Sequence, residues 1–278
     1  MSAIDYEAEY NNRARVPEHP EIFARWAKEA AAFRAAHANA ELGVSYGASP
    51  RQHIDFFWPS SNRDTPIVLF IHGGYWRSLD PSGFSHVAAG ANAHGFAFAC
   101  VGYDLCPVVS IETIIEQTRA ATAFVHRRHK KRLLASGHSA GGHLTACLVA
   151  TDWKKYGPDL PADLVTAGLS ISGLFDLAPL MQTGMNADLR LDAASAKRVS
   201  PIFWSVPAGR TLDAWVGGEE SHEFLRQSQA IEEAWGGKGV TTEYVAVPDT
   251  NHFTVLDPLV KADSDMTKRL MQLARAVR

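Results

Sequence analysis

One stretch decides the fold of this chain: Leu133-Leu134-Ala135-Ser136-Gly137-His138-Ser139-Ala140-Gly141-Gly142-His143-Leu144. It opens with a short apolar run that predicts a buried strand, passes through Gly-x-Ser-x-Gly, and continues into an Ala/Leu-rich segment that predicts a helix over residues 140–150. Strand, tight turn and helix in this order are typical of a nucleophile elbow, which holds a reactive serine at the tip of a strained turn. A plain Gly/Ser turn is the alternative, and the flanking strand and helix speak against it. The pattern therefore predicts that Ser139 is a nucleophile.

Apolar runs and helical segments alternate along the rest of the chain. The expected strands cover residues 52–59, 66–71, 96–101, 164–172, 211–216 and 240–247, and the expected helices cover residues 111–127, 223–235 and 259–277. Continuous apolar runs indicate strands that are buried on both faces of a parallel sheet. Strands that alternate with helices predict an α/β fold, in which helices cover both faces of a mostly parallel sheet.

Length and composition limit the possible classes of protein. The 278 residues suit one α/β domain over residues 1–278, with 46% hydrophobic residues. A net charge of −3 gives no reason to expect a nucleic-acid or membrane partner. The three cysteines have no metal or disulfide spacing, and the first residues have no apolar run of a signal peptide. We expect a cytoplasmic location. A homodimer stays possible.

Two segments flank or interrupt the expected α/β core. In residues 1–47, a helix that begins near Pro20 places Ile22, Trp26 and Phe33 at helical spacing, facing the protein body. This segment either packs on the domain or also leans over the active site. Residues 173–209 have no clear period and carry three prolines, which predicts an insertion over the strand ends and a candidate lid.

A serine nucleophile needs a histidine base and an acid that orients it, and in this type of fold they follow the serine in the order acid, histidine. His252 lies directly after the last expected strand, where the base belongs, whereas His222 opens a helix. The loop after residues 211–216 holds the acid, and it contains Glu219 and Glu220 but no aspartate. We predict Glu220.

Two other carboxylates compete with Glu220 for the role of the acid. Asp249 is the runner-up because it lies on the same loop as the expected base, and Asp213 lies inside a strand. The 12 histidines also raise the possibility of a metal hydrolase, but the chain has no His-Glu-x-x-His motif. No metal site is therefore predicted.

The negative oxygen that forms during acyl transfer requires hydrogen-bond donors. Ala140 follows the nucleophile at the start of its helix, and Gly73 and Gly74 follow the strand over residues 66–71. We predict that their backbone N–H groups form the oxyanion hole. Tyr75, Trp76, His138 and Phe253 are the predicted substrate contacts.

His72-Gly73-Gly74-Tyr75-Trp76, taken with Gly137-His138-Ser139-Ala140-Gly141-Gly142-His143, resembles the kynurenine formamidase (arylformamidase) branch of the α/β-hydrolases. This branch lies near the hormone-sensitive-lipase-like esterases. Segments that start at Tyr103, Ser172, Glu223 and Asn251 resemble it too. The resemblance implies the α/β-hydrolase fold and a serine hydrolase without metal or organic cofactor. It also implies an oxyanion hole formed by main-chain groups around Gly73, Gly74 and Tyr75, together with Ala140. The family usually has aspartate at the position of Glu220, so this residue departs from its pattern.

Three functions are compatible with these residues. The first is hydrolysis of a small acyl group from an aryl formamide or a short-chain ester, by a Ser-His-Glu triad through an acyl-enzyme. The second is a general carboxylesterase, because both activities use the same catalytic groups. The third is an inert binding protein on a hydrolase fold, for which the missing aspartate is the one argument.

Overall fold

The computed structural model describes residues 4–60 and 65–277, and these form an eight-stranded sheet of strand order β1-β2-β4-β3-β5-β6-β7-β8. The strands are β1 (Ala40–Ser45), β2 (His53–Phe57), β3 (Ile67–Ile71), β4 (Ala97–Val101), β5 (Leu133–His138), β6 (Ala167–Ile171), β7 (Thr211–Gly217) and β8 (Thr241–Val247). From β4 to β8 all neighbours pair in parallel, whereas β1 and β2 add an antiparallel edge. The residues of β3, β4 and β5 are all buried, as their apolar runs predict.

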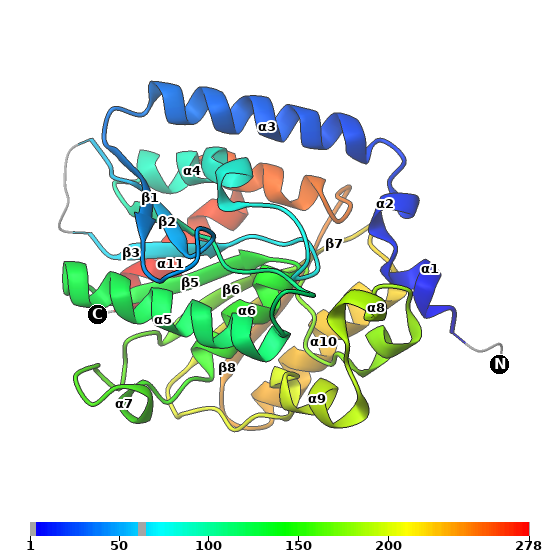
Figure 1. Ribbon diagram of the computed structural model, residues 1–278. Coiled ribbons are helices and arrows are strands. Elements are labelled where there is room, and N and C mark those ends of the chain that lie inside the picture. The colour runs from blue at the N-terminus through cyan, green and yellow to red at the C-terminus, as the bar shows by residue number, and fades with distance from the viewer. Residues whose placement is uncertain (1–3, 61–64, 278) are drawn as a thin grey trace.

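Helices cover both faces of the sheet (Figure 1). The longer ones are α3 (His19–Ala36), α5 (Ile111–His129), α6 (Ala140–Val149), α10 (His222–Gly236) and α11 (Asp265–Ala276). The shorter ones are α1 (Tyr6–Tyr10), α2 (Asn12–Arg15), α4 (Ala88–Ala93), α7 (Trp153–Tyr156), α8 (Asn186–Leu189) and α9 (Ala193–Arg198). Four 3₁₀ segments are described as well: η1 (Pro81–Val87), η2 (Ala178–Gln182), η3 (Pro201–Phe203) and η4 (Thr254–Val260).

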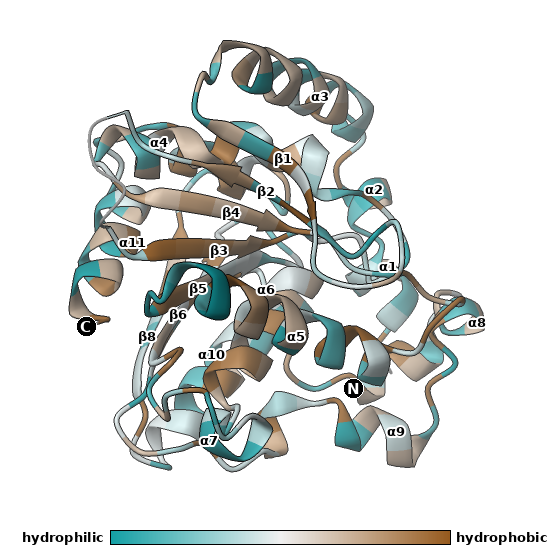
Figure 2. Cartoon of the chain, turned by 60° about the vertical axis from the view of Figure 1, so that its left-hand side comes forward, coloured by the Kyte–Doolittle hydropathy of each residue, from teal (hydrophilic) through white to brown (hydrophobic). Residues whose placement is uncertain are grey.

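The core has two halves, one on each face of the sheet. Residues of α5, α6 and α10 pack on one face, and residues of α3, α4 and α11 pack on the other. Figure 2 shows apolar strands inside and polar outer surfaces on the helices. The predicted α/β-hydrolase fold is confirmed. No helix within residues 4–60 and 65–277 is both long and apolar enough to cross a membrane.

The structure departs from the expected secondary structure at the edge strand β1 and at the start of the last helix. The edge strand β1 was not predicted, because it is only half buried and its pairing with β2 is interrupted at Gly43, where φ is +67°. The predicted helix over residues 259–277 begins only at Asp265. Ser264 caps it by accepting a hydrogen bond from the Thr267 N–H (3.1 Å), and η4 with Pro258 precedes it.

The N-terminal segment runs across the carboxyl end of the sheet. Helix α1, at the right of Figure 1, packs against α10 and against η2 of the 173–209 insertion. Tyr10 is fully buried, and its hydroxyl donates to Glu223 Oε2 (2.7 Å) and accepts from Gln227 Nε2 (3.0 Å). Glu7 Oε2 accepts from the Gly184 N–H (2.7 Å), which joins α1 to the 173–209 insertion. Both segments named in the sequence therefore meet over the strand ends.

Candidate active site

Ser139 lies at the turn between β5 and α6. Its φ is +57° and its ψ is −117°, a backbone conformation that residues other than glycine rarely adopt. The neighbouring glycines explain how the turn packs. A Cβ on Gly141 would lie 1.8 Å from the Ile71 carbonyl oxygen, and one on Gly137 would lie 2.4 Å from the Gly141 carbonyl oxygen. Only glycine allows α6 to approach β3 this closely, so the Gly-x-Ser-x-Gly pattern has a direct steric cause.

The structure brings Ser139, His252 and Glu220 together in a line of hydrogen bonds. His252 Nδ1 lies 2.6 Å from Glu220 Oε2, and His252 Nε2 lies 3.0 Å from Ser139 Oγ. All three side chains are buried. With the proton on Nδ1 donated to the carboxylate, the lone pair of Nε2 accepts the serine proton. This is the geometry that activates a serine hydroxyl.

Glu220 reaches the histidine from the loop after β7. Its other oxygen, Oε1, accepts from the Gly217 N–H (2.7 Å) and from the Ser172 hydroxyl (2.5 Å). Both carboxylate oxygens are thus fixed, although the side chain is one methylene longer than aspartate. Asp249 has no hydrogen bond to His252 within the described residues, and Asp213 pairs with Arg269 (2.6 Å).

Of the predicted oxyanion-hole residues, Gly73 lies against the nucleophile, and Gly74 and Tyr75 line the cavity above it. A Cβ on Gly73 would lie 3.0 Å from Ser139 Cβ and 2.9 Å from the His138 carbonyl oxygen, so Gly73 packs directly against the serine. Gly74 and Tyr75 have φ values of +106° and +50°. Within the described residues, the N–H groups of Gly73, Gly74, Tyr75 and Ala140 donate to no protein acceptor. They are available to a ligand oxygen.

His138 supports the catalytic loop from the residue before the nucleophile. Its Nε2–H donates to the carbonyl oxygen of His252 (2.7 Å). Burial, with a smaller contribution from the nearby His252, holds the pKa of His138 well below its ordinary value. His138 is therefore neutral at pH 7 and ties the β5 turn to the His252 loop.

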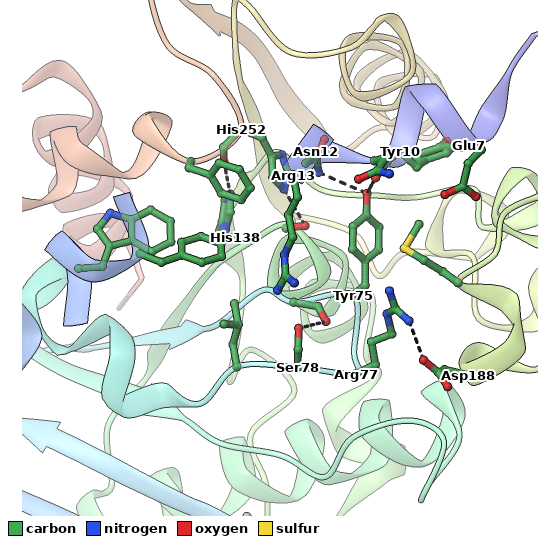
Figure 3. A pocket seen from close by; sticks show the side chains of 18 residues that line it. Glu7, Tyr10, Asn12, Arg13, Tyr75, Arg77, Ser78, His138, Asp188 and His252 are labelled. Atoms are coloured by element: carbon green, nitrogen blue, oxygen red, sulfur yellow. Dashed lines mark hydrogen bonds and ion pairs between the residues drawn. The ribbon is translucent and has the colours of Figure 1, made fainter. Parts of the chain in front are cut away.

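A cavity of about 270 Å³ opens over Ser139 (Figure 3). The cavity is lined by the catalytic His252 and by three of the predicted substrate contacts, Tyr75, His138 and Phe253. Phe23 and Trp26 of α3 add to the aromatic wall: Phe253 lies 5.0 Å and 6.2 Å from their ring centroids.

Trp76, a predicted substrate contact, does not reach the cavity. Its side chain is fully buried, does not line the cavity, and packs edge-on against His143 with 5.0 Å between ring centroids. The left-handed turn over Gly74–Trp76 sends Tyr75 toward the cavity and Trp76 into the core. Trp76 supports the loop rather than the substrate.

A second set of lining residues is not among the predicted substrate contacts, although Tyr10 belongs to the N-terminal segment that the sequence allows to lean over the active site. They are Glu7, Tyr10, Asn11, Asn12, Arg13, Arg77, Ser78, Leu79, Met185 and Asp188. Tyr75 Oη binds two of these, accepting from Asn12 Nδ2 (3.3 Å) and donating to the Tyr10 carbonyl oxygen (2.7 Å). These residues come from the N-terminal segment, from the loop after β3 and from the 173–209 insertion, where no periodic pattern pointed to them.

No group of three or more His, Cys, Asp or Glu side chains in the described part of the chain is arranged to hold a metal ion. Cys100, Cys106 and Cys147 are free and buried.

Comparisons with known proteins find relatives over most of the chain. Residues 54–176 match the BD-FAE family. The chain is 32% identical to kynurenine formamidase of Danio rerio, over 84% of this chain and 81% of that protein. It is 31% identical to kynurenine formamidase of Salmo salar, with the same coverage.

Two solved structures share the fold of this chain. A Silicibacter protein provisionally described as a thioesterase is 33% identical and superposes with a TM-score of 0.88, covering 97% of this chain and all of its own. An esterase from Pyrobaculum calidifontis shares the fold at 16% identity and a TM-score of 0.71, covering 93% of this chain and 91% of its own.

Proposed function

The chain belongs to the kynurenine formamidase family of α/β-hydrolases and is a hydrolase of the serine type; from this premise we propose that it removes the formyl group from aryl formamides. The observation that carries the proposal is the Ser139–His252–Glu220 hydrogen-bond line beneath a small cavity with an aromatic wall. A cavity of about 270 Å³ suits a small acyl group joined to one aromatic ring.

The geometry supports a two-step reaction. Ser139 Oγ attacks the formyl carbon while His252 Nε2 takes its proton. The N–H groups of Gly73, Gly74, Tyr75 and Ala140 stabilise the negative oxygen of the tetrahedral intermediate. His252 then donates the proton to the leaving aryl amine, and the C–N bond breaks. Water, deprotonated by the same histidine, releases formate from the formyl-enzyme.

The single test is a comparison of kcat/KM for N-formyl-L-kynurenine and for p-nitrophenyl acetate, with Ser139→Ala as the blank. We expect the formamide to be preferred and the variant to lose both activities. If the enzyme turns over only the ester, the formamide substrate is wrong and the triad stands. If Ser139→Ala keeps its activity, the triad is wrong.

Thioester hydrolysis is a second candidate, favoured by the Silicibacter relative alone. The same nucleophile would attack a thioester carbonyl, and the thiolate would leave without needing a proton. Adding a short acyl thioester of a small aromatic thiol to the panel ranks the two activities under one assay.

The finer points of location and assembly are proposals too. We propose a cytoplasmic enzyme, supported by three buried free cysteines, which suit a reducing compartment. A homodimer, and the absence of a nucleic-acid partner, stay predictions of the sequence.

A further inference from the structure

The cavity over Ser139 contains charged side chains, and all but one have a partner. Arg77 Nη1 pairs with Asp188 Oδ2 (2.6 Å), and Glu7 accepts the Gly184 N–H (2.7 Å). Arg13 also lines the cavity, yet within the described residues its guanidinium makes no hydrogen bond and no ion pair. A cation without an acid partner at the edge of a substrate cavity is a place where an anion can bind.

Arg13 is held in position by an aromatic side chain. Its guanidinium carbon lies 5.7 Å from the centroid of the Phe23 ring, within the range of a cation–π contact. Phe23 packs on Phe253, which directly follows His252 and lies 5.5 Å from its ring. The guanidinium thus stands at one end of the aromatic wall, and the catalytic histidine stands at the other.

The direction of the side chain agrees with this role. Figure 3 shows Arg13 extending from α2 into the cavity, with the guanidinium nitrogens at the end away from the helix. A guanidinium held near a ring keeps its in-plane N–H donors free. They suit a planar carboxylate, which can accept two parallel hydrogen bonds.

We propose that Arg13 determines substrate specificity by binding a carboxylate on the aromatic leaving part of the substrate. This inference rests on the proposed function, and it adds that the preferred substrates are aromatic acids rather than neutral formanilides. The aromatic wall receives the ring, the triad receives the acyl group, and Arg13 receives the acid.

The chain offers a matched control on the same helix. Arg15 carries the same charge two residues later, but it lines a different, smaller cavity together with Glu220 and His252. An effect of Arg15 on these two residues cancels in a ratio of two substrates, because both substrates use the same triad. Removing Arg13 or Arg15 changes the net charge equally, so long-range electrostatic effects should be the same. Of Arg13 and Arg15, only Arg13 lines the cavity that contains Ser139.

The test uses the three formamidobenzoates, which differ in the ring position of the carboxylate, and the three formamidobenzamides, in which a neutral amide replaces it. The readout is the ratio of kcat/KM for each acid to that for its amide. We expect wild type to prefer at least one acid, and Arg13→Gln to lower that ratio roughly tenfold through KM, the size of one charge-assisted contact. Arg13→Lys should keep part of the preference, and Arg15→Gln should keep all of it.

Salt gives a second readout that a structural role would not move. Because exposed charges are screened, raising NaCl from 0.05 to about 0.5 M should raise KM for the acid in wild type but not in Arg13→Gln. The proposal is overturned if wild type shows no preference for any acid, or if Arg15→Gln lowers the ratio as much as Arg13→Gln.

Failure of the proposed function gives a different result. If no formamide is hydrolysed, the same ratio is measured with acetoxybenzoates against acetoxybenzamides, since the ester uses the same triad. Loss of formamide turnover then contradicts the formamidase proposal, while the acid-to-amide ratio still decides whether Arg13 binds the carboxylate.

Discussion

Ser172 donates a hydrogen bond of 2.5 Å to Glu220 Oε1, the oxygen that does not face His252. Ser172 itself has a φ of +51°, so strained backbone after β6 places this hydroxyl. The Gly217 N–H binds the same oxygen. The glutamate is therefore clamped on one side and presents Oε2 to the histidine on the other, which compensates for its greater length.

The carboxylate should be sensitive to both charge and length. We expect Glu220→Gln to lower kcat by roughly a thousandfold or more, because an amide no longer stabilises the protonated histidine. Glu220→Asp should lower kcat less, by roughly 10- to 100-fold, because the shorter side chain cannot reach Gly217, Ser172 and His252 together. Steady-state kinetics measure both. Glu219→Gln is the control, and an equal loss there would contradict the assignment of the acid.

Removing the clamp should impair catalysis without preventing binding. Ser172→Ala deletes one hydrogen bond to a charged group, which corresponds to a loss of about 1.5–3 kcal/mol. We expect kcat to fall roughly tenfold and KM to stay within about twofold. If KM rises and kcat does not change, Ser172 acts on the substrate site instead.

The oxyanion loop should not tolerate even one added methyl group. In Gly73→Ala the new Cβ would lie 2.9 Å from the His138 carbonyl oxygen and 3.0 Å from Ser139 Cβ, so the loop must shift. Because misplacing one oxyanion donor costs about 100- to 1,000-fold in kcat, we expect a loss of that size. Gly83→Ala is the matched control, since nothing lies within 4 Å of its added Cβ. Near-normal kcat in Gly73→Ala would contradict the predicted oxyanion hole.

The hydrogen bonds of the Tyr10 hydroxyl, which anchor the N-terminal segment, should contribute to the free energy of unfolding. Tyr10→Phe removes a buried hydroxyl that binds Glu223 and Gln227, and it leaves both without that partner. Burial raises the pKa of Tyr10, so the hydroxyl is neutral and donates at all ordinary pH values. We expect the free energy of unfolding to fall by about 1–3 kcal/mol in denaturant titrations. Because Tyr10 also lines the cavity, KM should rise; unchanged stability would show that the anchor lies elsewhere.

Acid should destabilise the protein through its buried histidines. Burial lowers the pKa of His72 and of His143 to about 4. The folded state then binds fewer protons than the unfolded state, whose histidines titrate near 6.5, so stability falls as the pH drops from 6.5 toward 4. Each group contributes a slope of about 1.4 kcal/mol per pH unit inside that window. Denaturation at several pH values measures the slope, and His143→Gln should reduce it; a flat profile would contradict neutral buried histidines.

The sequence predicts the catalytic triad much better than it predicts the residues that line the cavity. Ser139 follows from one local motif, and the order acid then histidine leads from it to Glu220 and His252, the side chains that the structure joins. Each of these lies directly after a strand, where topology restricts position. The central strands were also predictable, because their burial on both faces leaves continuous apolar runs.

The remaining lining residues had no such signal. Arg13 lies on a four-residue helix, and its place at the edge of the cavity depends on how Tyr10 docks on α10, more than 200 residues away in sequence. Trp76 lies in a motif that the sequence does reveal, but its side chain was predicted to contact the substrate and instead points into the core. That direction depends on a left-handed turn that residue types alone do not specify. Contacts between distant segments and local side-chain direction are what the sequence alone left open.

The anchoring of the N-terminal segment on α10 has an evolutionary consequence. The reacting groups stand on strand ends that the whole sheet holds in place, whereas Arg13 stands on a short peripheral helix that covers them. Substitutions in that helix can change which molecules are accepted without disturbing the machinery that cleaves them. Relatives of this chain can therefore diverge in substrate range while their reaction chemistry is inherited intact.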